Sequence, residues 1–140
     1  MQEAQNTKAI QDMYGAFGRG DVQALLALVD ESIVWKPILG AASYVPTAGE
    51  RRGKAAVADF FKTLSETIAF QEFQPKQFVA QGDTVVALGS YAATAKATGR
   101  PFRSEWTMVF TLKNGKVVEF REYADSAAIN ASFQGAAARA

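Results

Sequence analysis

The chain changes its hydrophobic period near its middle, and this change limits the folds that it can adopt. In the first half, apolar residues recur every three or four positions in two stripes, Ile10, Met13, Tyr14 and Phe17, and then Val57, Phe60, Phe61, Leu64 and Ile68. Such spacing predicts amphipathic helices. From Phe70 onward apolar and polar residues alternate, as in strands. Helices followed by a run of strands predict an α+β fold with helices on one face of a curved antiparallel sheet.

Turn and capping residues set the predicted boundaries of these elements. Asp21 is a plausible N-cap for a short second helix, and Asp125 for a C-terminal helix that ends near residue 133. Pro75 predicts that its strand is an edge strand or contains a bulge. The predicted strands are 33–36, 70–80, 84–97, 102–112 and 116–123, separated by loops and turns rich in Gly and Pro.

Length and composition exclude several classes of function. The 140 residues fit one domain, which we assign to 1–134, followed by a flexible Ala-rich tail at 135–140. The chain has neither Cys nor His, which excludes disulfides, thiolate or imidazole metal sites and a Ser-His-Asp triad. Acid–base chemistry must therefore use Asp, Glu, Lys or Tyr. We expect no metal and no cofactor, since Asp30 and Glu31 are the only adjacent acidic pair.

The charge balance points away from polyanionic and membrane partners. Lys and Arg number 15 and Asp and Glu 14, and no basic stripe interleaves with aromatic residues, so we expect no nucleic-acid binding. No apolar run approaches the roughly 18 residues of a membrane span, and the N-terminus lacks an apolar signal core. We therefore expect a cytoplasmic protein that does not bind membranes.

One carboxylate breaks the alternating pattern of the last two strands. Trp106, Met108 and Phe110 share one face of strand 102–112, and the same face of strand 116–123 carries Phe120 and Glu122. A three-residue loop at 113–115 would place Trp106 opposite Glu122. Burial beside an indole would raise the pKa of Glu122 toward that of a useful general acid or base. The alternative is that Glu122 reaches water at the sheet rim.

Two tyrosines are further candidates. Strand 84–97 surrounds Tyr91 with small residues on one face, which either leave room for a ligand cavity or admit a closely packed helix. Tyr14 lies one turn before the end of the first helix, where its hydroxyl either enters the same space or belongs to the core.

Several segments together resemble the nuclear transport factor 2-like superfamily, in particular its SnoaL-like members. The likeness covers nearly the whole chain and is carried by 14–21 (YGAFGRGD), 52–61 (RGKAAVADFF), Glu105-Trp106, 114–123 (NGKVVEFREY) and Asp125. The resemblance implies a cone-shaped fold in which three N-terminal helices and a strongly curved antiparallel sheet line a pocket, with a short C-terminal helix. It also implies a homodimer through the outer sheet face. Members include steroid isomerases, polyketide cyclases, epoxide hydrolases and non-catalytic binding or scaffold proteins.

The catalytic positions of those enzymes are only partly filled here. The steroid-isomerase Asp before a proline corresponds to Lys36, and the oxyanion-hole Tyr and Asp fall near Met13 and Met108. The Arg and Asp of limonene-type epoxide hydrolases correspond to Gly89 and Tyr91, and their last-strand Asp corresponds to Glu122. The cyclase pair of Asp and His is incomplete without His.

Pattern and resemblance together give one site prediction. Glu122, Lys36 and Tyr91 are the predicted catalytic residues of a cofactor-free isomerase, cyclase or hydrolase that binds a small, largely apolar molecule. The predicted pocket residues are Tyr14, Phe17, Phe60, Leu64, Trp106, Met108 and Phe120. The alternative is a binding protein, or an interaction module whose outer face carries Thr107, Val109, Thr111, Arg121 and Tyr123.

Overall fold

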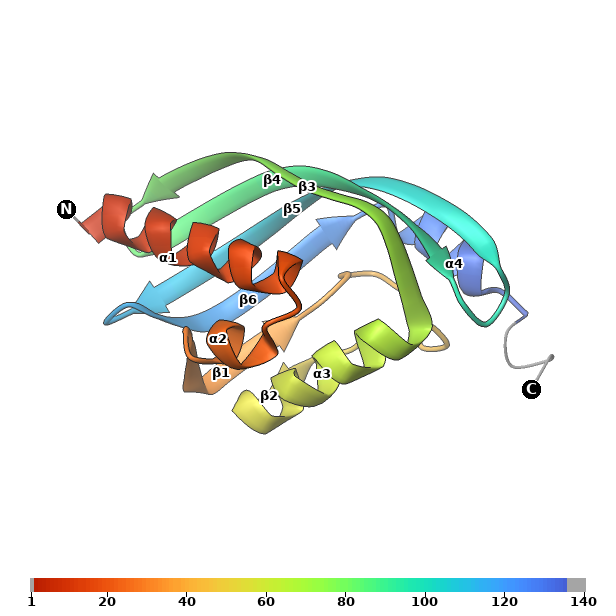
Figure 1. Cartoon of the computed structure of the whole chain (residues 1–140), viewed down its shortest axis with the longest axis horizontal. Coiled ribbons are helices and arrows are strands. Elements are labelled where there is room, and N and C mark those ends of the chain that lie inside the picture. Colours follow the sequence, from red (N-terminus) through yellow and green to blue (C-terminus); the bar gives the residue numbers. More distant parts are fainter. Residues whose placement is uncertain (1, 136–140) are drawn as a thin grey trace.

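Helices close the open side of a strongly bent sheet in the computed structural model, which describes residues 2–135 (Figure 1). The elements are α1 (Gln2–Gly18), α2 (Val22–Leu26), β1 (Val29–Lys36), β2 (Arg51–Arg52), α3 (Lys54–Thr67), β3 (Ile68–Gln81), β4 (Thr84–Ala95), β5 (Arg100–Lys113), β6 (Lys116–Ala124) and α4 (Ser126–Phe133). This order confirms the predicted α+β class. The predicted tail lies, from residue 136 on, outside the described residues.

The six strands form one mixed sheet in the order β2-β1-β6-β5-β4-β3. Consecutive strands from β3 to β6 pair antiparallel, as predicted. The prediction of a purely antiparallel sheet is wrong for β1, which runs parallel to β6. Hairpins fix the relative direction of consecutive strands only, and these two strands are separated by most of the chain.

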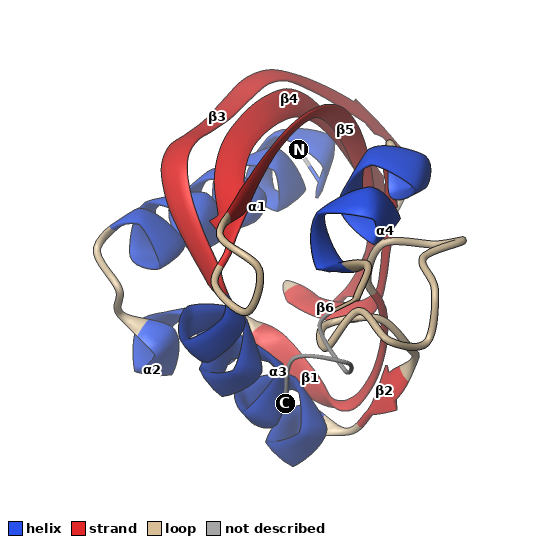
Figure 2. Cartoon of the chain, turned by 90° about the vertical axis from the view of Figure 1, so that its right-hand side faces the viewer, coloured by secondary structure: helices blue, strands red, loops and turns tan. Residues whose placement is uncertain are grey.

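Irregular pairing along β3 accounts for part of the curvature. β3 is an edge strand, and its register with β4 shifts between Phe70 and Glu72 and again between Pro75 and Gln77. Pro75 therefore marks both an edge strand and a bulge, and bulges bend the strand that carries them. Seen end-on, the sheet wraps around the interior, with α1, α2 and α3 on its open side and α4 at one end (Figure 2).

Helix ends follow the predicted caps. The Asp21 carboxylate accepts from the Ala24 N–H at 3.1 Å, and Asp125 accepts from the Ala128 N–H at 3.0 Å. α3 passes straight into β3, because Ile68, which we assigned to the helical stripe, is extended (φ −132°, ψ 130°). This uninterrupted junction holds the inner face of α3 against the sheet.

The β5–β6 hairpin differs from the predicted register by two residues. Lys113 pairs with Lys116 across a two-residue turn in which Asn114 and Gly115 both have positive φ, 52° and 78°. Val118 is then skipped in the ladder, so that Met108, and not Trp106, lies opposite Glu122. The turn is one residue shorter than predicted, and the skipped residue shifts the pairing by one more position. Together they shift the register by two residues, so each side chain stays on its predicted face. Glu122 therefore keeps the inward orientation that the pattern predicted.

Candidate functional site

The interior contains a cavity of about 70 Å³ between α1, α3 and the inner face of the sheet. It is lined almost entirely by aromatic and aliphatic side chains. Tyr14, Phe17, Phe60, Leu64, Met108 and Phe120 from the predicted pocket set are among its lining residues, together with Tyr91 and Glu122. Aromatic rings on this wall contact one another, including Phe17 and Phe73 at a centroid separation of 4.9 Å.

Glu122 is the carboxylate of this cavity. Its position on the inward face of β6 leaves it 5% exposed, so the solvated-rim alternative is wrong. Burial raises its pKa to about 7, because the charged form loses its hydration, while a Tyr91 hydrogen bond and an Ile38 backbone hydrogen bond lower it in part. A carboxyl group in this state holds or releases a proton near neutral pH.

Tyr91 binds the carboxylate directly. Its hydroxyl donates to Oε2 of Glu122 at 2.8 Å, between β4 and β6 on either side of β5. Burial, the Glu122 charge and this hydrogen bond all raise the pKa of Tyr91. The phenol therefore stays protonated and donates its O–H to the carboxylate.

A strained turn after β1 supplies the backbone hydrogen bond to Glu122. Ile38 follows Pro37 and has φ 45°, which is unusual for a β-branched residue. Its N–H hydrogen-bonds the Glu122 side chain, and the Leu39 N–H donates to the Glu122 carbonyl at 2.9 Å. Strain of this kind persists where surrounding contacts hold it, and here the contacts fix both ends of Glu122.

Tyr14 reaches the same part of the cavity from α1. Its hydroxyl donates to Sδ of Met108 at 3.0 Å, and Met108 is the cross-strand partner of Glu122. Burial raises the pKa of Tyr14, and the nearby Glu122 charge raises it further. The structure thus brings two phenol donors and one carboxyl group together around Met108.

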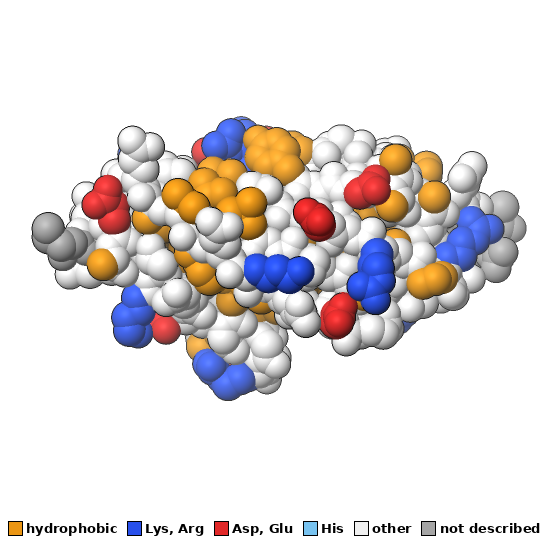
Figure 3. Space-filling model, turned by 90° about the horizontal axis from the view of Figure 1, so that it is seen from above, with side chains coloured by type: hydrophobic (Ala, Val, Ile, Leu, Met, Phe, Trp, Pro, Cys, Tyr) orange, Lys and Arg blue, Asp and Glu red, His pale blue; other side chains and the backbone are white. Residues whose placement is uncertain are grey.

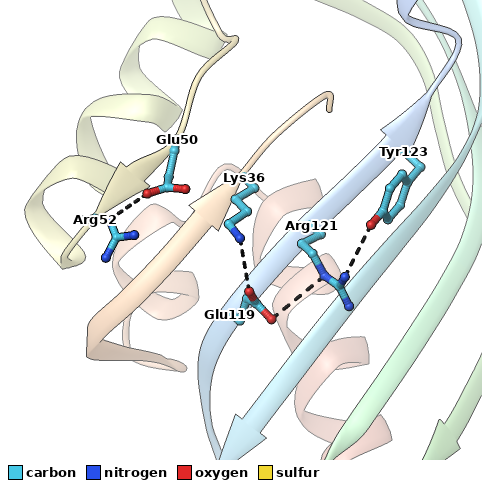
Figure 4. A network of polar contacts seen from close by, with 6 residues as sticks. All are labelled: Lys36, Glu50, Arg52, Glu119, Arg121 and Tyr123. Carbon is cyan, nitrogen blue, oxygen red and sulfur yellow. Dashed lines mark hydrogen bonds and ion pairs between the residues drawn. The ribbon is translucent and has the colours of Figure 1, made fainter. Parts of the chain in front are cut away.

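Lys36 does not join them, which corrects its predicted place in the site. Its Nζ lies 3.5 Å from Oε2 of Glu119 on the opposite face of the sheet, in a network with Arg121 and Tyr123 (Figure 4). Because side chains alternate along β1, the inward position belongs to its neighbour Trp35, which is 3% exposed and lines the cavity.

Trp106 is buried but lies outside the set that lines the cavity, contrary to the prediction. Its indole occupies the space over Gly89, its partner across the β4–β5 ladder, where an added Cβ would collide with the ring. The absence of a side chain at Gly89 thus makes room for the Trp106 indole. Trp106 also stacks on Tyr14 with ring centroids 5.7 Å apart, so it supports the wall from behind.

Sequence reasoning missed twelve lining residues, among them Trp35, Ile38 and Thr47. Strand alternation was a signal for Trp35, whereas no local pattern marked Ile38 or Thr47. Within residues 2–135 no group of three Asp or Glu side chains could hold a metal ion. None of the described helices is long and apolar enough to cross a membrane.

Fold and cavity together define a nuclear transport factor 2-like protein, and the family model of the SnoaL-like domain matches residues 10–120. The chain belongs to this family. A nuclear transport factor 2-like protein of Burkholderia xenovorans is 34% identical, with 94% of this chain and 98% of that one covered and a TM-score of 0.84.

Two more distant structures share the fold. A candidate isomerase of Rhodopseudomonas palustris is 21% identical over 96% of this chain and 99% of its own, with a TM-score of 0.76. A candidate polyketide cyclase of Xanthomonas campestris is 19% identical over 94% of this chain and 98% of its own, with a TM-score of 0.75.

Proposed function

We propose that the chain is a cofactor-independent isomerase or cyclase that acts on a small, largely apolar molecule in its interior cavity. The observation that carries this proposal is Glu122, a buried carboxyl group with a pKa raised to about 7 on an apolar wall. The names of the two distant structures, a candidate isomerase and a candidate cyclase, support the same reaction classes.

Glu122 would transfer the proton. A general acid–base is most effective when its pKa lies near the working pH. A single such carboxyl group can take a proton from one atom of a bound molecule and return it to another, which is an isomerisation. The same transfer can accompany ring closure. Neither reaction consumes a redox cofactor.

The two phenols would have different roles, because Tyr91 gives its one O–H to Glu122 and Tyr14 can turn to negative charge that develops on the ligand. Tyr91 holds Oε2 of Glu122 and orients the carboxyl group. Tyr14 donates to a thioether sulfur, which is a weak acceptor, so its hydroxyl can turn to a ligand oxygen at small cost. Donors aimed at a developing oxyanion in an apolar site are effective catalytic groups.

Ligand entry would widen the cavity. At about 70 Å³ it is smaller than the roughly 150 Å³ cavity that accommodates benzene in another protein. The lining residues that are partly exposed lie on α1, α3 and β3, and they are Tyr14, Phe17, Leu64, Phe70 and Phe73. We therefore place the entrance between these three elements.

Identification of the ligand comes first in the test. Native mass spectrometry of the purified chain should show a copurifying small molecule, and turnover of that molecule is then compared in Glu122→Gln and Glu119→Gln. We expect Glu122→Gln to lose 10²- to 10⁴-fold in kcat and Glu119→Gln to keep its rate. Full activity of Glu122→Gln would show that the proton-transfer assignment is wrong.

A second candidate function is binding without catalysis. Glu122 is the only carboxylate or basic side chain among the described lining residues, so a charged catalytic partner is absent from that set. A ligand that binds tightly to the unaltered protein and leaves it chemically unchanged would favour this function.

We also propose, as part of the same account, a cytoplasmic homodimer that pairs through the outer sheet face. The exposed side chains Leu88 and Tyr123 lie in one row across β4, β5 and β6 with Thr107 between them. Seen from above, the surface shows apolar patches between single charged side chains (Figure 3). Light scattering at micromolar concentration should give about twice 15.1 kDa, and the monomer mass throughout would contradict pairing.

A further inference from the structure

The end of the cavity beneath β1 contains two polar atoms that the described residues leave without hydrogen bonds. Nε1 of Trp35 and Oγ1 of Thr47 are buried, and neither has a hydrogen-bond partner among the described residues. Trp35 is 3% exposed and Thr47 is 0% exposed, and both side chains line the cavity. Buried donors without partners are costly and rare in folded proteins.

These two residues belong to the same end of the cavity. Trp35 pairs with Arg51 across β1 and β2, and Nη1 of Arg51 donates to the Thr47 carbonyl at 2.8 Å. The guanidinium also lies 5.2 Å from the centre of the Phe60 ring, which is itself 5.7 Å from the Trp35 ring. Arg51 thus anchors the loop that carries Thr47 and packs against Phe60, which is the aromatic neighbour of Trp35.

This end is separate from the carboxyl group. Trp35 stacks on Phe120 with ring centroids 3.9 Å apart, and the two residues are partners between β1 and β6. Glu122 lies two residues further along β6 on the same face, which corresponds to about 7 Å at the usual rise of a strand. The Trp35 indole therefore lies about one side-chain repeat along the sheet from the Glu122 carboxyl group, in a cavity whose walls are otherwise almost entirely apolar.

We propose that Trp35 and Thr47 bind an acceptor oxygen of an uncharged ligand with an apolar body, a ketone or a related carbonyl compound. This proposal rests on the proposed function in that the ligand occupies the same cavity. An indole N–H donates and cannot accept, and a threonine hydroxyl can donate beside it. Neighbouring side chains cover both atoms in the described structure, so the oxygen reaches them as the cavity widens around the ligand.

The polarity of the site then fixes how the ligand lies. With its oxygen at Trp35, a ring of about six members extends toward Glu122. The carbon that exchanges a proton with Glu122 then lies in the part of the ring that faces Glu122. An apolar molecule without a hydrogen-bond acceptor contacts the same walls but leaves the donors of Trp35 and Thr47 unpaired.

A matched pair of probes and the two tryptophans test this proposal. Cyclohexanone and methylenecyclohexane have nearly the same shape and differ in an oxygen for a methylene group. The two indole N–H signals are followed in ¹H–¹⁵N spectra and assigned with Trp35→Phe. Trp106 is an internal control, because its Nε1 is also buried without a described partner but its side chain does not line the cavity.

We expect cyclohexanone to move the Trp35 N–H signal downfield, methylenecyclohexane to leave it nearly unchanged, and neither probe to shift Trp106 comparably. The ketone should bind about threefold to tenfold tighter than the alkene, as one net hydrogen bond implies. This preference should vanish in Trp35→Phe and shrink in Thr47→Val.

Three results would overturn the proposal. Equal affinity for both probes, or a preference that Trp35→Phe retains, would show that the oxygen is not bound here, while the cavity would still stand as a binding site. Failure of both probes to bind would remove the cavity as a site for such ligands, and the proposed function would fall with it.

Discussion

Glu119 and Glu122 lie three residues apart on β6 and have opposite environments. Glu119 is on the outer face, where its half-exposed side chain meets Lys36 and Arg121. Glu122 is on the inner face, 5% exposed, with a phenol as its side-chain partner. One residue type therefore provides a surface ion pair on one face of the strand and a titratable group in an apolar cavity on the other.

This difference shows that sheet orientation, and not residue type, determines the chemistry of each carboxylate. Outside, water and basic side chains stabilise the charged form, and the pair adds little to stability because it is screened. Inside, desolvation opposes the charge and raises the pKa of Glu122. Mutations on the two faces should therefore have unlike effects.

The largest contrast is expected in how stability depends on pH. The pKa of Glu122 is about 7 in the folded chain and near 4.5 when unfolded, so the folded state binds the proton more tightly. Stability from this group is present below pH 4.5 and is lost as pH rises toward 7. Between pH 5 and pH 8 the unfolding free energy of the unaltered protein should fall by roughly 2–3 kcal/mol relative to Glu122→Gln. Urea titrations across this range measure the difference.

Glu119→Gln is the matched control for that experiment. Its unfolding free energy should follow that of the unaltered protein within about 1 kcal/mol at every pH. Parallel curves for the unaltered protein and Glu122→Gln would contradict the buried assignment.

A smaller effect is expected from the phenol that binds the carboxylate. Tyr91→Phe removes the donor to Glu122, and an unsatisfied buried acceptor costs about 1–3 kcal/mol. The loss of unfolding free energy should be greater at pH 8 than at pH 5, because Glu122 is charged at pH 8 and a charged carboxylate is stabilised more by the donor. Thermal unfolding at both pH values detects this, and an equal loss at both would show that the hydroxyl does not act through Glu122.

The smallest effect is expected on the outer face. Lys36→Met removes one of the two basic partners of Glu119 and should change the unfolding free energy by less than about 1 kcal/mol. Once a substrate is known, its kcat should also stay the same, because Lys36 lies on the opposite face from the cavity. A loss of more than tenfold in kcat would restore Lys36 to the site.

The alternation of inward and outward side chains along the strands predicted the site better than the predicted register of the β5–β6 hairpin did. Glu122 faces inward, as its position relative to Phe120 predicted, although the assumed loop was one residue too long and the bulge at Val118 was not foreseen. The two errors compensate because faces alternate with period two.

The prediction failed where local pattern does not determine geometry. Placing Lys36 in the site followed the family resemblance against the alternation that puts Trp35 inside. The parallel pairing of β1 with β6 and the positive φ of Ile38 depend on contacts between distant segments. Trp106 was expected on the cavity wall, but the space over Gly89 holds its ring instead.

The central claim is that Glu122 is a buried carboxyl group that titrates near neutral pH. A ¹³C NMR titration of glutamate side-chain carboxyl signals, with Glu122 assigned by its loss in Glu122→Gln, measures this directly. The account predicts a midpoint of about 7 for that signal. A midpoint near 4.5 would mean that Glu122 is solvated, and it would contradict both the cavity assignment and the proposed proton transfer.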